Sequence, residues 1–366
     1  MILDKRLVKD FDKALLAATF ILCLGGVFIL HSATQAKGLS FIESYVFRQM
    51  NWIVLAAASL LIVINISYQK FIDISYVLYA INIVLLMLVL ILGRERLGAQ
   101  RWFTIGNFAF QPSEFIKINF ILTLANILGS KKGGLEDAKM FFIPLVLLAI
   151  PFLLVLVQPD LGTALLLIPI FLAMAYVGGM RVKHLLILVI IGISTLPFFW
   201  HFLKDYQKQR LLVFLNPNVD PLGAGYTIIQ SKIAVGSGGL IGKGWLAGTQ
   251  NQLNFLPERH TDFIFSVIGE EWGLFGALIL ILLYFLITRR GFDIASSTND
   301  MYGKLVAVGI VVLISLQVVI NIAMTIGLMP VIGIPLPLVS YGGSSMLATF
   351  IAIGLLLNIG MRRSRF

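Results

Sequence analysis

The chain has 366 residues, of which 58% are hydrophobic and only 13% are charged, and its mean hydropathy is +0.94. A soluble domain carries roughly 25% charged residues, so this composition excludes an ordinary soluble enzyme and indicates a polytopic membrane protein. The net charge is +10. No basic patch interleaved with aromatic residues lies on a soluble segment, so nothing favours nucleic-acid binding. The single cysteine, Cys23, excludes an internal disulfide and a cysteine metal cluster.

Apolar runs long enough to cross a bilayer, about 20 residues each, recur along the whole chain. They predict about ten transmembrane helices, near residues 14–32, 50–68, 74–93, 113–130, 141–157, 161–178, 183–203, 262–288, 302–328 and 337–361. The first run is too long for a cleaved signal peptide and follows acidic residues, so it is expected to stay as a signal anchor. The predicted fold class is an all-α polytopic membrane protein with a large external loop between helices 7 and 8.

Lys and Arg residues beside short loops favour the cytoplasmic side of a membrane. If both termini are cytoplasmic, the inner segments carry sixteen such residues and the short outer loops five. The inner residues are Lys5, Arg6, Lys9, Lys13, Lys70, Lys131, Lys132, Lys139, Arg181, Lys183, Arg289, Arg290, Lys304, Arg362, Arg363 and Arg365; the outer are Lys37, Arg48, Arg94, Arg96 and Arg101. This asymmetry predicts cytoplasmic termini and an external segment 204–261.

Nothing in the composition marks a second domain, so residues 1–366 are predicted to form one membrane domain with external loops near 93–112 and 204–261. The first loop carries three arginines, which suits an anion better than a folded module. The second holds eight glycines between Gly223 and Gly248. The stretch "GSGGLIGKG" lacks the Gly and the Ser or Thr of a phosphate-binding Walker loop. Its glycines instead favour short re-entrant or interfacial helices, one of them over "GAGYTIIQSKIAVG".

Ionisable side chains beside apolar helices are costly and are therefore candidate functional residues. The densest group precedes the eighth run, where "PERHTDF" contains Glu258, Arg259, His260 and Asp262. Asp262 is predicted to open this helix, with Ser266, Glu270 and Gly273 on the same face and Glu271 opposite. Asp262 could be a first-turn acid stabilised by the helix dipole, or a functional carboxylate.

For the other polar residues as well, a structural role and a functional role both remain open. Glu114 and Lys117, three apart, could form an intrahelical ion pair, or Lys117 could face an anionic substrate while Glu114 helps hold a cation. Asp160 could be only a helix N-cap. The external Arg48, Arg101 and Arg210 could be solvated anchors at the membrane interface.

The positions of these charges favour chemistry or binding at the outer leaflet. A transporter would place ionisable groups near the midplane of broken helices, and an ion channel would show polar rings along several helices. Neither pattern is present in the sequence.

The carboxyl-terminal stretch "NIAMTIGLMPVIGIPLPLVSYGGSS", residues 321–345, resembles the signature of the SEDS family, which contains the RodA and FtsW proteins of bacterial wall synthesis. The resemblance covers essentially the whole chain, through "GAQRWF" (98–103), "QPSEFIK" (111–117), "QPDLGTA" (158–164) and "PERHTDFIF" (257–265). The segments "DYQKQR" (205–210) and 223–240 are more similar to RodA than to FtsW.

This resemblance implies a peptidoglycan glycosyltransferase that polymerises lipid II on the outer face of the bacterial cytoplasmic membrane during cell elongation. It implies an inverting reaction with lipid II as donor and acceptor, and a class B penicillin-binding protein as partner within the elongation machinery. It places the catalytic aspartate at Asp262. The candidate substrate-binding residues are Arg48, Arg101, Lys117, Arg210, Glu258 and Ser344, and a divalent cation, Mg or Mn, is expected at Glu114 or Asp160.

Two alternatives to the glycosyltransferase remain open. A lipid II flippase would also use arginines and a polar cavity, but it would need no general base. A purely structural scaffold for the penicillin-binding protein would leave the external charges unexplained.

Overall fold

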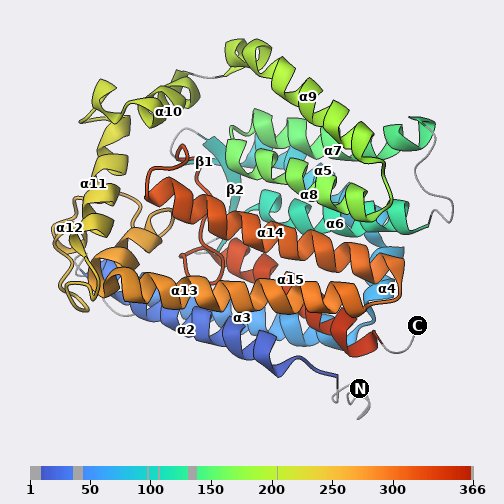
Figure 1. Ribbon diagram of the computed structural model, residues 1–366, viewed down its shortest axis with the longest axis horizontal. Coiled ribbons are helices and arrows are strands. Elements are labelled where there is room, and N and C mark those ends of the chain that lie inside the picture. The colour runs from blue at the N-terminus through green and yellow to red at the C-terminus, as the bar shows by residue number, and fades with distance from the viewer. Residues whose placement is uncertain are drawn as a thin grey trace.

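A computed structural model describes residues 10–35, 44–96, 99–105, 108–130, 138–203 and 205–363. Among the basic residues used above for topology, Lys5, Arg6, Lys9, Lys37, Lys131, Lys132 and Arg365 lie outside these ranges. Each of the ten predicted apolar runs contains a described helix (Figure 1): α2 (Lys13–Gln35), α3 (Tyr45–Asn65), α5 (Ser75–Leu92), α6 (Pro112–Gly129), α7 (Ala138–Val157), α8 (Leu161–Val177), α9 (Val182–Phe199), α13 (Ile264–Ser297), α14 (Met301–Thr325) and α15 (Gly343–Arg362).

Within the described part of the chain, six helices are long and apolar enough to cross a membrane: α2, α3, α5, α13, α14 and α15. Shorter apolar helices cover Phe142–Val157, Leu161–Val177 and Val182–Thr195. The predicted fold class, a helical polytopic membrane protein, is therefore confirmed.

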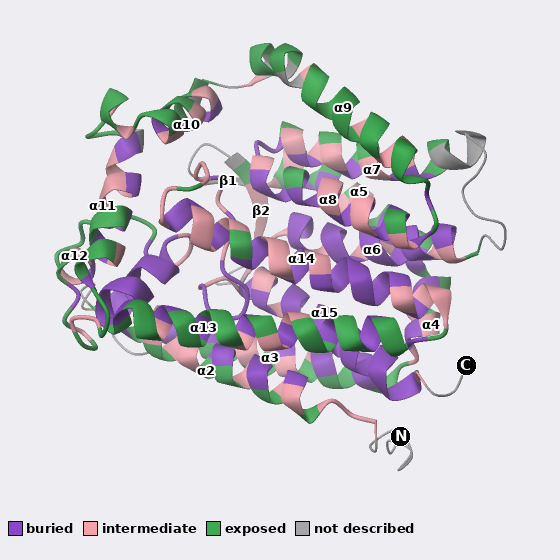
Figure 2. Cartoon of the chain, viewed as in Figure 1, coloured by how far each residue is buried: buried purple, intermediate pink, exposed green. Residues whose placement is uncertain are grey.

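The helices α6, α14 and α15 form the centre of the molecule. Helix α15 packs along α3, and α14 packs against α6, α8 and α13. Their side chains are mostly buried, whereas α9 and the outer face of α13 are mostly exposed (Figure 2). The exposed side chains are largely Leu, Ile, Val and Phe, which are compatible with lipid and not with water. Polar groups at the centre must therefore be paired within the protein.

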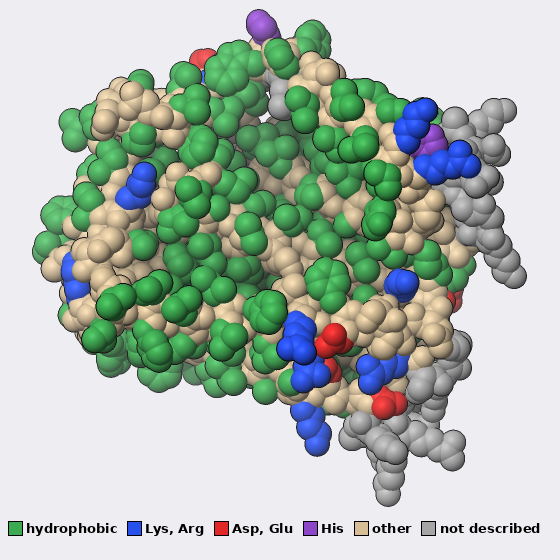
Figure 3. Space-filling model, in the orientation of Figure 1, with side chains coloured by type: hydrophobic (Ala, Val, Ile, Leu, Met, Phe, Trp, Pro, Cys, Tyr) green, Lys and Arg blue, Asp and Glu red, His purple; other side chains and the backbone are tan. Residues whose placement is uncertain are grey.

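The basic side chains are distributed unevenly over the surface. The start of α2 and the end of α15 lie at the same end of the molecule (Figure 1). On the face shown in Figure 3, most Lys and Arg side chains gather at that end, while apolar side chains cover the rest. The short helix α4 (Tyr68–Asp73) lies at this end and joins α3 to α5.

The two predicted loops both contain regular structure. The first contains a three-stranded antiparallel sheet of β1 (Arg94–Arg96), β2 (Ala99–Ile105) and β3 (Phe108–Phe110), a small folded element that the sequence did not suggest. The long segment contains α10 (Asp205–Leu215), α11 (Ala224–Ser237) and α12 (Thr249–Gln252), with a 3-10 turn at Pro217–Val219; another 3-10 turn, at Trp200–Phe202, precedes the segment. The helix predicted over "GAGYTIIQSKIAVG" is confirmed as α11.

Helix α13 is interrupted at Gly273, whose φ of 62° is accessible mainly to glycine. The interruption frees backbone groups that bond to residues 239–244, within the segment predicted to be external. The carbonyls of Glu270 and Glu271 accept from the amides of Lys243 and Gly244, both at 3.0 Å, and the amide of Leu274 donates to Gly239 at 2.9 Å. The buried Glu270 carboxylate also pairs with Lys243 Nζ at 2.8 Å. Residues 239–244 are thus fixed to α13.

Helix α15 begins at Gly343, six residues later than predicted. The residues before it, 330–342, contain Pro330, Pro335 and Pro337, which lack the amide that a helix requires. They form an irregular segment, with Gly333 and Leu338 at positive φ. This segment lies beside residues 258–262 and forms one wall of the candidate site.

Candidate active site

Asp262 lies two residues before α13 and is not part of that helix. The amides of Thr261 and Phe263 both bond to the carbonyl of Glu258, at 3.1 and 3.3 Å, which makes a turn in place of a first helical turn. Glu258 has a φ of 48°, in the left-handed region. The predicted helical face shared by Asp262 with Ser266, Glu270 and Gly273 is therefore wrong, because helical spacing does not extend through the turn.

The surroundings of Asp262 raise the pKa of its carboxyl group to about 6, mainly through burial and also through the negative charge of Glu258. The cations Arg210 and Arg101 oppose this rise, and Asp160 adds to it. The side chain is half-buried, so it is partly removed from water and still reachable. A carboxyl group with such a pKa is mostly ionised at neutral pH and is a stronger base than an ordinary aspartate.

Arg101 comes from β2 and is fixed at the turn between α7 and α8. Its Nε donates to the carbonyl of Gln158 at 2.9 Å, and its Nη2 donates to the carbonyl of Pro159. Asp160 accepts from the amide of Thr163 at 3.2 Å, so the predicted N-cap of α8 is confirmed. Arg101 Nη1 lies 3.9 Å from the carboxylate of Asp160. These contacts orient the guanidinium and leave it partly exposed.

Four other predicted substrate-binding residues differ in their exposure: three are exposed and one is buried. Arg210, on α10, is exposed and donates to the carbonyl of Val331 at 3.2 Å. Glu258 is exposed and accepts from the hydroxyl of Thr261 at 3.1 Å. Arg48 is exposed on the first turn of α3. Ser344 is buried, accepts from the amide of Gln111 at 3.0 Å and donates to the carbonyl of Ala109 at 3.2 Å, so it joins α15 to the end of β3.

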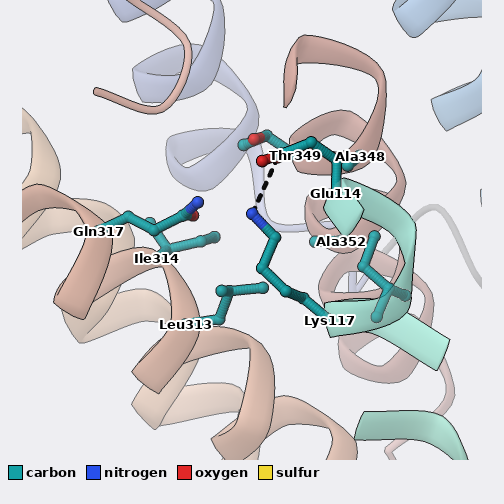
Figure 4. A pocket seen from close by; sticks show the side chains of 9 residues that line it. Glu114, Lys117, Leu313, Ile314, Gln317, Ala348, Thr349 and Ala352 are labelled. Atoms are coloured by element: carbon teal, nitrogen blue, oxygen red, sulfur yellow. Dashed lines mark hydrogen bonds and ion pairs between the residues drawn. The ribbon is translucent and has the colours of Figure 1, made fainter. Parts of the chain in front are cut away.

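Glu114 and Lys117 form the predicted ion pair on α6, with Lys117 Nζ 2.9 Å from Glu114 Oε2. Both side chains are buried. The pair lines a cavity of about 10 Å³ together with Gln317 of α14 and Thr349 of α15 (Figure 4). A space of this size holds about one water molecule. The charges of Glu258, Arg101, Arg210 and Asp160 thus act on Asp262, and Asp262 is not among the residues that line the cavity at Glu114 and Lys117.

The residues predicted to hold a divalent cation do not fit one in this arrangement. Such cations require several carboxylate or carbonyl oxygens around one point. The Glu114 carboxylate is paired with an ammonium group, and Asp160 accepts from Thr163, Ser113 and Gln111. Over the described ranges, no group of three or more His, Cys, Asp or Glu side chains could hold a metal ion. We therefore derive no step through a metal at these residues.

The sequence reasoning did not select three residues that contact the backbone around Asp262. Asn321 and Ser340 donate to the carbonyls of Asp262 and Thr261, at 3.0 and 2.6 Å. The amide of Tyr341 donates to the carbonyl of His260 at 2.9 Å. The sequence does contain a signal for one of them: Asn321 lies inside an apolar run, and a buried side-chain amide must find hydrogen-bond partners.

Comparison with known proteins assigns this architecture to one family. Residues 13–365 match the family model of the FtsW, RodA and SpoVE cell cycle proteins. The peptidoglycan glycosyltransferase MrdB of Escherichia coli is 46% identical over 78% of this chain and 77% of its own. The peptidoglycan glycosyltransferase RodA of Treponema pallidum is 35% identical over 97% of this chain and 99% of its own.

Two solved structures agree with these sequence matches. A chain from "Structural coordination of polymerization and crosslinking by a peptidoglycan synthase complex" has a TM-score of 0.83 and 34% identity, and the match covers 97% of this chain and 99% of that one. The crystal structure of Thermus thermophilus RodA has a TM-score of 0.73 and 29% identity over 96% of this chain and 97% of that one. The chain therefore belongs to the FtsW/RodA/SpoVE family, the SEDS peptidoglycan glycosyltransferases.

Proposed function

We propose that this glycosyltransferase polymerises lipid II, with Asp262 as the general base. Donor and acceptor would both be undecaprenyl-pyrophosphate disaccharide-pentapeptides, used during cell elongation. The observation that carries the proposal is the half-buried Asp262 carboxyl, whose pKa is raised to about 6 and which lies among Arg101, Arg210 and Glu258. A base and cations in one place are what glycosyl transfer from a diphosphate requires.

In the proposed reaction, the 4-hydroxyl of the acceptor sugar attacks the anomeric carbon of the donor sugar. The new C–O bond forms as the bond to the diphosphate breaks, and the configuration at that carbon inverts. Asp262 takes the proton of the hydroxyl, and the undecaprenyl diphosphate leaves with the bonding electrons. A positioned base contributes about 10²- to 10⁴-fold to such a step.

Arg101 and Arg210 would stabilise the negative charge that develops on the leaving diphosphate. Both lower the pKa of Asp262, which places their positive charges within electrostatic reach of that carboxylate. Arg101 is the better oriented of the two, because two carbonyls fix its guanidinium. Arg48 and Glu258 are exposed and would contact the sugars or the peptide.

The site would open at the outer face of the bacterial cytoplasmic membrane. The lipid of the substrate must stay in the bilayer while its sugars stay in water, so an active site at the interface fits both parts. Lys and Arg gather at the opposite end, where α2 starts and α15 ends (Figure 3). By the positive-inside rule that end is cytoplasmic, with both termini inside.

The partner would be a class B penicillin-binding protein that crosslinks the new glycan strands. The solved structure with the TM-score of 0.83 comes from a peptidoglycan synthase complex that coordinates polymerization and crosslinking. This similarity supports a transpeptidase partner for the present chain.

The test is glycan formation from labelled lipid II by the purified chain with its partner transpeptidase. Asp262→Asn keeps the size of the side chain and removes the base, so we expect a loss of at least about 10²-fold with normal folding and partner binding. Wild-type polymerisation by Asp262→Asn would contradict the proposed mechanism. Lipid II flipping in liposomes is measured separately, and a variant that loses flipping and polymerisation together would favour transport.

A further inference from the structure

The backbone carbonyls of three consecutive residues, the last of them Asp262, accept hydrogen bonds from two distant elements, α14 and the irregular segment 330–342. The carbonyls of His260, Thr261 and Asp262 accept, in order, from the amide of Tyr341, the hydroxyl of Ser340 and the side-chain amide of Asn321. These donors lie about 60 to 80 positions further along the chain. No helical hydrogen bond could replace them, because the turn precedes α13.

Each of the two side-chain donors also holds the irregular segment 330–342. Ser340 Oγ accepts from the amide of Leu336 at 2.9 Å, and Asn321 Nδ2 donates to the carbonyl of Ile334 at 2.8 Å. Each side chain therefore bridges two pieces of irregular backbone. Ser340 is 4% exposed and Asn321 is fully buried, so water cannot readily replace either bridge.

The segment held in this way is itself a wall of the site. A Cβ added at Gly333 would lie 3.6 Å from Asp262 Oδ2, so the backbone there passes beside the reacting carboxylate. Glu258 and Leu338, one on each side of the junction, both have positive φ, and such strained residues persist only where the surrounding structure fixes them. The bridges hold the carboxylate and the wall at a fixed separation.

We propose that Asn321 and Ser340 are positioning residues that act through Asp262, by fixing its backbone against the segment 330–342. This inference rests on the proposed role of Asp262 as the base. A displacement of about 1 Å between reacting groups can lower a rate on the order of 10²-fold. Loss of either bridge should therefore lower kcat and leave KM for lipid II nearly unchanged.

The pH dependence separates positioning from a loss of folded protein. Burial is the largest cause of the raised pKa of Asp262, and Glu258, Arg210, Arg101 and Asp160 supply the neighbouring charges. A loosened turn admits water, so the pKa of the carboxyl group falls and the acid limb of the pH–rate profile moves to lower pH. A mere decrease in the amount of folded enzyme would scale the rate equally at every pH.

The experiment compares Ser340→Ala and Asn321→Leu with two controls, in complex with the partner transpeptidase. Ser340→Thr retains the hydroxyl and should restore most of the activity. Asn358→Leu removes an asparagine that is as buried as Asn321. Asn358 lies near the C-terminal end of α15, where its amide donates to the carbonyls of Val63 and Ile64 at the end of α3. This control measures the general cost of removing a buried amide.

For Ser340→Ala and Asn321→Leu we expect kcat to fall by about 10- to 100-fold, with KM within about two-fold and the acid limb displaced to lower pH. Asn358→Leu should lower thermal stability and leave the acid limb in place. An unmoved acid limb in both site variants, or a wild-type kcat, would overturn the inference. Activity of Asp262→Asn at the wild-type rate would instead refute the proposed function itself, so the two failures are distinguishable.

Discussion

At the scale of single residues, the environment of Asp262 supports its proposed chemistry and costs stability. Burial and Glu258 disfavour its charged form, while Arg210 and Arg101 favour it. A half-buried carboxylate near both signs of charge therefore has a pKa that individual neighbours can move in either direction. Three predictions belong to this scale.

The polymerisation rate should depend on pH through Asp262, because only its deprotonated form acts as a base. The rate is expected to fall as the pH decreases through about 6. Glu258→Gln removes a negative neighbour and should displace this acid limb to lower pH, whereas Arg210→Gln removes a cation and should displace it to higher pH. Shifts in the same direction for the two variants would contradict this electrostatic account.

Asp262→Asn should raise thermal stability at pH 8 while it abolishes activity. The pKa of Asp262 is higher in the folded chain, about 6, than its ordinary value of 3.8. The folded state therefore binds a proton more tightly, and stability decreases as the pH rises through this interval and stays lower above it. Asparagine carries no charge and avoids this cost. Equal or lower melting temperatures for Asp262→Asn across pH 7 to 8, measured in detergent, would refute this prediction.

The buried pair of Glu114 and Lys117 should behave as a unit in stability. Removal of one partner leaves an uncompensated charge in a cavity of about 10 Å³, and such a change costs about 3–5 kcal/mol. We expect Lys117→Met alone to lower the melting temperature strongly and the double variant Glu114→Gln, Lys117→Met to recover most of it. Additive effects of the two substitutions would contradict the pairing. The polymerisation rate of the stable double variant then tests whether Lys117 serves the substrate.

At the scale of elements, the break in α13 connects this helix to the segment that contains residues 239–252. The backbone groups freed around Gly273 bond to residues 239–244, and the Glu270 carboxylate accepts from Lys243, from Thr249 and from the amide of Gln250. The short helix α12 and the turn before it are therefore anchored to α13. We expect these hydrogen bonds to α13 to hold residues 239–252 in place near Asp262.

Gly273→Ala should release residues 239–252 from α13. Its φ of 62° disfavours any side chain, and an added Cβ would lie 2.4 Å from the amide nitrogen of Gly242. We expect faster proteolysis within 239–254 and a lower melting temperature. The matched control is Gly25→Ala in α2, where an added Cβ meets nothing within 4 Å and alanine favours the helix. Equal protease resistance of Gly273→Ala and Gly25→Ala would show that the break at Gly273 is not needed to hold residues 239–254 against α13.

At the scale of the whole molecule, the proposed topology places α10, α11 and α12 outside the cell and the C-terminal end of α13 inside. Single cysteines at Asn218 and Ala247, both exposed, should react with an impermeant thiol reagent in intact spheroplasts. A cysteine at Ser296, exposed near the end of α13, should react only after lysis. The native Cys23 is buried and gives little background. Protection of both external positions until lysis would reverse the orientation.

The sequence by itself determined the helices of this protein, because a bilayer requires long apolar runs whatever their packing. It predicted α11, and for contacts that are local in the chain it offered the Asp160 cap and the Glu114–Lys117 pair each as one of two alternatives; the structure contains both contacts. The motif residues identified the family and made Asp262 the candidate base, although the sequence does not show how these residues contact one another.

Only the tertiary structure decided what depends on contacts between distant segments. Helical spacing placed Asp262 inside α13, but the turn at Glu258 and the donors Asn321 and Ser340 place it before that helix. The same holds for Ser344, which bonds to the end of β3, and for Glu270, which pairs with Lys243. The physical reason is that a buried polar group must find a partner, and the sequence shows that need without showing which distant residue meets it.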